Sequence, residues 1–111
     1  MSEAVNGPLW QLSACELQGR YRDRQLTPLE VAQAVLARLE AVNPRLNAVI
    51  CRRDAAFLSE AEAATLRHAK GRPISPLDGV PITVKDSLLT ADMPTTWGTP
   101  ALRDYRTGHG E

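Results

Sequence analysis

The chain has 111 residues, 43% of them hydrophobic and 23% charged, which is ordinary for a soluble globular protein of one small domain. Its formal net charge is zero, so no overall field favours binding to nucleic acid or to an anionic membrane surface. No stretch approaches the ~20 apolar residues that span a bilayer, and the first eight residues lack the features of a signal peptide. We therefore expect a cytoplasmic protein that contacts neither nucleic acid nor membrane.

Two helix starts are marked by capping boxes in the first half of the chain. Ser13 begins an S-x-x-E sequence, in which both polar side chains satisfy free backbone N–H groups, and this predicts a short helix over residues 14–23. Thr27 begins a second such sequence, with proline at the first helical position. An apolar stripe at helical spacing follows, and we predict that this second helix ends at Asn43-Pro44.

One further helix and two short strands are predicted beyond it. Alanine-rich residues 54–70 favour a helix with Gly71 as its C-terminal stop. Residues 46–50 predict a short strand or an extended link, and the apolar run at residues 80–84 predicts a strand. Two strands cannot form a stable sheet by themselves. We therefore expect an α/β fold, in which this chain supplies helices and the first strands of a mixed sheet covered by helices, incomplete in this chain.

The cysteines and histidines do not indicate a metal centre. Cys15 and Cys51 are far apart and belong to no CxxC or Cys/His cluster, so we predict two reduced, partly buried thiols. His68 lies near the apolar face of its predicted helix and is interpreted as structural. His109 has no acidic or cysteine partner at metal-ligand spacing. We expect no metal and no cofactor.

The strongest functional signal lies in residues 73–86. A turn-rich lead-in with three prolines and a glycine feeds a short run of β-branched residues, and that run delivers Lys85 at its end. A lysine in this position either extends to water or sits in a low-dielectric pocket, where its amine can lose its proton and act as a base. The residues alone leave both interpretations open.

A family resemblance rests on two neighbouring segments. The sequence P-L-D-G-V-P-I-T-V-K-D at residues 76–86, followed by P-T-T-W-G-T at residues 94–99, resembles the amidase signature family of serine amidohydrolases and amidotransferase A subunits. Every fixed position of the family pattern P-L-x-G-[VI]-P-x-x-x-K-D and P-T-T-x-G-[ST] is matched. Residues 1–111 look like the amino-terminal part of a single amidase-signature domain, truncated before the Gly/Ser-rich segment of the family.

The resemblance implies amide hydrolysis through a Ser-cisSer-Lys triad and an acyl-enzyme, with Lys85 as the terminal base and a small-molecule amide as substrate. It implies no cofactor. Both triad serines belong to the family's downstream segment, so we expect the 111-residue chain alone to be inactive. Two alternatives stay open: the A subunit of a tRNA-dependent glutamine amidotransferase, with its partner subunits, and a truncated interaction module without catalysis. The amide, its binding residues and homo-oligomerisation are not specified by the sequence.

The residues around Lys85 are given structural roles. Asp86 is expected to fix the turn after the strand through its side chain. Thr95 and Thr96 are expected to hydrogen-bond the loop backbone, in preference to lining a substrate site. Trp97 either packs against the strand layer or borders a pocket, and the sequence does not separate these two placements.

Overall fold

The computed structural model describes residues 8–111, which form two compact units, one ending at Pro81 and the other spanning Ile82–Glu111. No helix in this part of the chain is long and apolar enough to cross a membrane. The first unit is helical and the second is built from turns around one short 3-10 helix. The elements are η2 (Leu9–Gln11), α1 (Ala14–Arg22), α2 (Pro28–Leu46), α3 (Asp54–Ala69) and η3 (Pro100–Leu102).

Both predicted helix starts are confirmed as complete capping boxes. At the start of α1, Ser13 Oγ accepts a hydrogen bond from Glu16 N at 3.1 Å, and Glu16 Oε1 accepts one from Ser13 N at 2.8 Å. At the start of α2, Thr27 Oγ1 accepts from Glu30 N at 3.2 Å, and Glu30 Oε1 accepts from Thr27 N at 2.9 Å. Local sequence therefore fixes where both helices begin.

The end of α3 is also as predicted. Gly71 adopts a φ of +69°, in the left-handed region that favours glycine. Its N–H donates to the carbonyl of His68 at 3.0 Å, and the N–H of Arg72 donates to the carbonyl of Arg67 at 2.8 Å. These two bonds form a Schellman motif, which satisfies carbonyls that the helix itself leaves free.

The predicted end of α2 at Asn43-Pro44 is wrong, because the helix continues through the proline to Leu46. Proline removes only one intrahelical N–H, and here it does so within the last turn. The Asn43 side chain stabilises the exit instead: its Oδ1 accepts from Ala48 N at 2.9 Å and from Val49 N at 3.0 Å. The helix then closes at Asn47, which has a left-handed φ of 51°.

The core of the first unit lies where α1, the α1–α2 connection and the start of α2 meet. Its members are large side chains from the two helices and from the connection between them, and partly buried apolar side chains, Val80 among them, pack against these members. Burial of each such side chain contributes roughly 1.5–3 kcal/mol. The buried cluster consists of Leu17, Tyr21, Leu26 and Val31.

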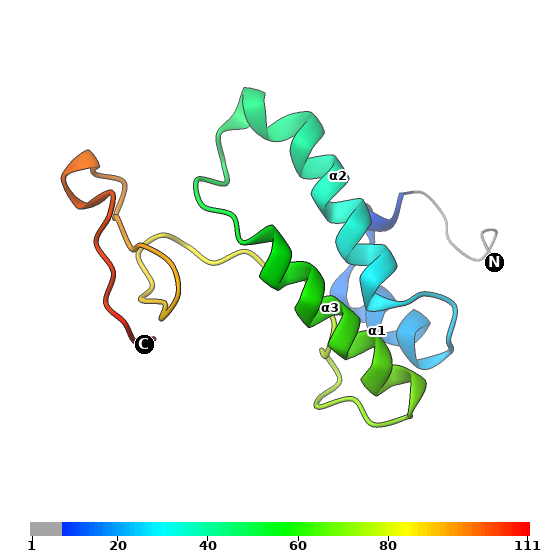
Figure 1. Ribbon diagram of the computed structural model, residues 1–111. Helices are drawn as coiled ribbons and strands as arrows, with labels where there is room; N and C mark the ends of the chain where they lie inside the picture. The colour runs from blue at the N-terminus through cyan, green and yellow to red at the C-terminus, as the bar shows by residue number, and fades with distance from the viewer. Residues whose placement is uncertain (1–7) are drawn as a thin grey trace. The chain divides into compact units, whose positions relative to one another are not determined.

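Helices α2 and α3 run antiparallel and side by side (Figure 1). Small buried residues, Ala32 on α2 and Ala61 and Ala64 on α3, let the two backbones approach closely. A polar tie joins their ends, since Thr65 Oγ1 accepts a hydrogen bond from Leu29 N at 3.1 Å. The face of α3 that carries Ala61 and Ala64 therefore packs against α2.

The structure assigns no strand to residues 46–50 or 80–84, and no strand elsewhere in residues 8–111. Residues 47–50 form an irregular link, which is one of the two predicted forms, whereas the strand predicted at residues 80–84 is wrong for the described chain. A strand is defined by hydrogen bonds to a neighbouring strand. The first segment has two of its N–H groups bonded to the Asn43 side chain. In the second, Ile82 is 77% exposed and Val84 is 44% exposed. The mixed sheet stays a prediction for the whole protein.

The cysteines are free, as predicted, but they are not partly buried: Cys15 and Cys51 are both exposed. Cys15 lies in the first turn of α1, and Cys51 lies in the irregular link before α3. Within the described residues, no group of three or more His, Cys, Asp or Glu side chains could hold a metal ion.

Candidate active site

Lys85 lies in the second unit, in an irregular segment that leads into a turn. The Lys85 carbonyl accepts a hydrogen bond from Leu88 N at 3.0 Å, which closes that turn. The side chain is exposed, and among residues 8–111 it has no hydrogen-bond or ion-pair partner. The expected burial at a strand end is therefore not found in the described chain, because nothing there covers the segment. The backbone of Lys85 is held while its amine is free.

Asp86, the next residue, bonds to the second matched segment. Its Oδ1 accepts from Thr96 N at 2.8 Å, and its Oδ2 accepts from the Thr96 hydroxyl and, at 3.4 Å, from Gly98 N. Its own carbonyl accepts from Trp97 N at 3.1 Å. The hydrogen bond from the Thr96 hydroxyl, followed by that from the Thr96 N–H, holds the pKa of the Asp86 carboxyl below its usual range. The prediction that the Asp86 side chain fixes the turn directly after its own segment is therefore wrong, because a backbone hydrogen bond from Leu88 N to the Lys85 carbonyl closes that turn. The Asp86 carboxylate instead fixes the turn at residues 96–99.

The segment that Asp86 holds is a tight turn with an uncommon backbone. Thr99 N donates to the Thr96 carbonyl at 3.0 Å. Both central residues have positive φ, 49° at Trp97 and 76° at Gly98, as in a type I′ turn. A residue with a side chain is disfavoured there by about 1 kcal/mol or more. The Trp97 ring is half exposed and lies 6.3 Å from the Tyr105 ring, centroid to centroid.

The two threonines of this segment are used structurally, as predicted. Thr95 is 1% exposed, with its N–H donating to the Tyr105 carbonyl at 2.9 Å and its hydroxyl to the Leu88 carbonyl at 3.4 Å. Thr96 is engaged with Asp86. Hydrogen bonds from threonine hydroxyl and backbone N–H groups to carbonyl and carboxylate oxygens therefore stabilise the second unit.

In the first unit, an ion pair fixes the loop that precedes the lysine segment. Arg67 on α3 donates from Nε and Nη2 to the two carboxylate oxygens of Asp78, both at 2.7 Å, and Asp78 Oδ2 also accepts from Ile74 N at 3.0 Å. The hydrogen bonds from Arg67 are the largest cause that lowers the pKa of Asp78 to about 2. Sequence reasoning missed this pair, because its members lie 11 positions apart with no shared motif.

Gly79 lies against the core and requires its glycine. Its φ is +90°, and a Cβ at this position would lie 2.6 Å from Cγ of Pro28. Its carbonyl accepts the Tyr21 hydroxyl at 2.8 Å, and burial raises the pKa of that hydroxyl above its usual range. The neighbouring carbonyl of Asp78 lies 2.8 Å from His68 Nε2, and the His68 ring lies 5.1 Å from that of Tyr21, which confirms His68 as structural.

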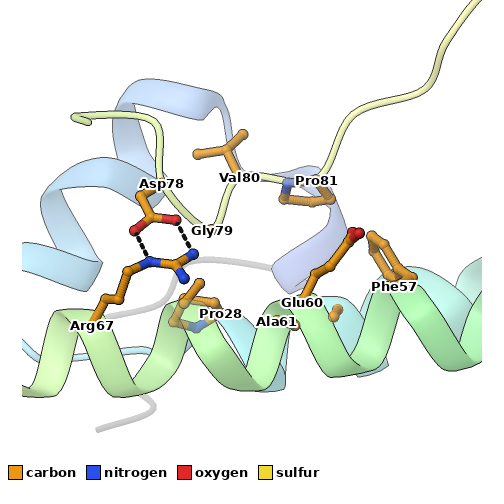
Figure 2. Close-up of a pocket in the computed structure, with 11 residues that line it drawn as sticks. Pro28, Phe57, Glu60, Ala61, Arg67, Asp78, Gly79, Val80 and Pro81 are labelled. Atoms are coloured by element: carbon orange, nitrogen blue, oxygen red, sulfur yellow. Dashed lines mark hydrogen bonds and ion pairs between the residues drawn. The ribbon is translucent and has the colours of Figure 1, made fainter. Parts of the chain in front are cut away.

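A cavity of about 170 Å³ lies between α3, the start of α2 and residues 78–81. Figure 2 shows Arg67 rising from α3 to Asp78 at one side and Phe57 and Glu60 at the other. Each charged group around this cavity already has a partner: Arg67 with Asp78, and Glu60 with Arg53. The cavity therefore offers no free acid, base or nucleophile, and the candidate chemistry rests with Lys85.

The chain belongs to the amidase family, because a family model described as Amidase matches residues 30–109. It is 40% identical over 99 residues to an indoleacetamide hydrolase of Bradyrhizobium diazoefficiens, covering 89% of this chain and 19% of that protein. It is also 40% identical over 82 residues to the A subunit of a glutamyl-tRNA(Gln) amidotransferase of Chloroflexus aggregans, covering 74% and 17%.

The fold is also similar to that of a solved relative. A bacterial aryl acylamidase of the amidase signature family superposes with a TM-score of 0.82 at 31% identity, over 90% of this chain and 21% of that chain. This chain thus spans about a fifth of the length of the curated relatives it matches. Its membership in the amidase signature family confirms the resemblance found in the sequence.

Proposed function

We propose that the whole protein hydrolyses carboxylic amides through a Ser-cisSer-Lys triad, to which this chain contributes Lys85. The match of residues 30–109 to the amidase family supports it, as does the similarity to hydrolases of indoleacetamide and aryl acylamides. The observation that carries the assignment is the arrangement at Lys85: a backbone held by its own turn and by Asp86, and an amine without a partner in residues 8–111.

The proposed step needs an amine. The nucleophilic serine attacks the amide carbonyl, and its proton passes through the cis serine to Nζ of Lys85. The tetrahedral intermediate then expels ammonia or an amine, which takes up the proton that Lys85 returns through the cis serine, and water later hydrolyses the acyl-serine ester to the free acid and the serine. A neutral lysine has a lone pair for this proton, whereas an arginine guanidinium stays charged and has none. The resemblance to the family implies that both serines belong to a segment downstream of the residues matched here, so we expect the 111 residues alone to be inert.

Lys85 can be tested against the only other lysine of the chain. In the whole protein, Lys85→Ala and Lys85→Arg should each lower kcat by several orders of magnitude while circular dichroism shows a normal fold. Lys70, exposed at the end of α3, is the matched control, and Lys70→Ala and Lys70→Arg should keep wild-type turnover. The substrates would be indoleacetamide and a p-nitroanilide of a simple acid. An active Lys85→Arg enzyme would make Lys85 a surface residue and refute the proposal.

A second candidate function is supported by the relatives named as amidotransferase A subunits, which match at 36–41% identity. The same triad would then release ammonia from glutamine for a partner protein of the complex. Ammonia release from glutamine only in the presence of the other subunits, with no hydrolysis of indoleacetamide, would favour this function. Absence of turnover on every amide, together with a normal fold, would favour the non-catalytic module.

A further inference from the structure

We propose that Asp86 is a positioning residue for Lys85, acting through its hydrogen bonds to Thr96 and Gly98. This inference rests on the proposed function of Lys85. It concerns how the lysine is held, and it assigns no contact between Asp86 and substrate.

Several donors restrain the one carboxylate of Asp86. Three reach its oxygens, two from Thr96 and one from Gly98, and a fourth bond joins the Asp86 carbonyl to Trp97 N. The bonds to the carboxylate link positions 10 to 12 apart in the sequence. A carboxylate that accepts several N–H and O–H donors is held in one orientation, and so is the backbone that carries it.

This restraint lies directly beside the lysine. Asp86 follows Lys85 in the chain, and the Lys85 carbonyl is itself bonded to Leu88 N at 3.0 Å. The peptide group between the two residues is therefore restrained at the Lys85 carbonyl by Leu88 and at Asp86 by the hydrogen bonds of that residue. The starting point of the lysine side chain is fixed relative to the turn at residues 96–99, while the amine stays unengaged within the described chain.

The turn that Asp86 holds is strained. Trp97 has a φ of 49°, which costs about 1 kcal/mol or more for a residue other than glycine. The Asp86 carboxylate bonds to the residues on either side of Trp97, and the Asp86 carbonyl bonds to the N–H of Trp97 itself, which stabilises the conformation. Asp86 thus holds two matched segments together, one carrying the lysine and one carrying the strained turn.

Such a residue should affect turnover more than binding. A displacement of about 1 Å of a reacting group can lower the rate about 100-fold. In the whole protein, Asp86→Ala should therefore reduce kcat for indoleacetamide by about 100-fold and leave KM within about threefold. Asp104, an exposed aspartate of the same unit, is the matched control, and Asp104→Ala should change neither constant.

Two additional comparisons separate positioning from general structural support. Thr96→Ser keeps the hydroxyl donor and should retain near wild-type kcat, whereas Thr96→Val removes it and should reduce kcat about tenfold. In the Lys85→Ala background, Asp86→Ala should cause no further loss, because a residue that acts through Lys85 has nothing left to position.

Each outcome decides the inference. Wild-type kcat in Asp86→Ala, a raised KM with unchanged kcat, or an equal further loss in the Lys85→Ala background would overturn it. If Asp86→Ala fails to fold, the Thr96 pair decides: equal kcat in the serine and valine variants overturns the inference, and a lower kcat for valine alone supports it. Normal turnover in Lys85→Ala would instead refute the proposed function itself, and this inference with it.

Discussion

The ion pair between Arg67 and Asp78 should make stability fall at low pH. The Asp78 side chain is only 6% exposed and accepts three hydrogen bonds, two of them from Arg67. Its pKa is lowered from 3.8 to about 2 in the folded chain. A carboxyl with a folded-state pKa below its unfolded value stabilises the fold above the unfolded pKa. That contribution is lost as the pH falls from about 5 towards 2.

The size of the effect follows from the shift. At ~1.4 kcal/mol per unit, the change from 3.8 to about 2 corresponds to about 2 kcal/mol of unfolding free energy. This is an upper value, because the Arg67 side chain is 34% exposed and water screens the pair on that side. Asp78→Asn removes the titrating charge and leaves the packing almost unchanged.

The assay is urea unfolding of the wild type and of Asp78→Asn between about pH 6 and pH 2.5, in the whole protein. Other titrating groups contribute equally to both, so the difference between the two unfolding free energies isolates Asp78. It should be about 2 kcal/mol at the upper end of this range and should fall to about 1 kcal/mol or less at the lowest pH. Asp104→Asn, at an exposed position, should show no such convergence. A difference that stays constant with pH would refute the linkage between this carboxyl and stability.

Two further predictions concern local backbone features. Thr27→Ala removes one side of the α2 capping box and should lower the free energy of urea unfolding by about 1 kcal/mol. Thr27→Ser keeps the hydroxyl and should restore this stability, and turnover per folded molecule should not change in either variant. A large loss of turnover would place this helix near the chemistry. Gly79→Ala should cost about 2 to 4 kcal/mol, because it adds a left-handed φ penalty to a 2.6 Å clash with Pro28. Gly71→Ala has the same φ problem but open space around it, so equal losses in the two variants would exclude the clash.

Helix boundaries could be predicted wherever their determinants are close in sequence. The boxes at Ser13 and Thr27 and the glycine stop at Gly71 each involve residues within one turn, and all three are present. The end of α2 could not be predicted in this way. There the Asn43 side chain accepts hydrogen bonds from backbone N–H groups five and six residues later. A rule that ends a helix at proline does not take this interaction into account.

The strand prediction for residues 80–84 failed for a different reason. Residues 80–84 have the composition of a buried strand, but a strand depends on a neighbour that supplies the other half of each hydrogen bond. Within residues 8–111 no such neighbour exists, and β-branched side chains of this segment stay exposed. Composition can indicate that a segment is suited to form a strand, but whether the strand forms depends on a second segment that pairs with it.

In the candidate site, the residue type could be predicted from the sequence, whereas the placement of the side chain could not. Lys85 could be selected from the sequence, because its residue type suits a base and the segment around it matches a family pattern. What distinguishes a base from a surface lysine is placement, since a base needs a fixed position relative to groups from other segments. Asp86 and Thr96 provide such restraints, and both stand inside the matched segments. The pattern therefore includes the residues that we propose to hold the lysine as well as the lysine itself.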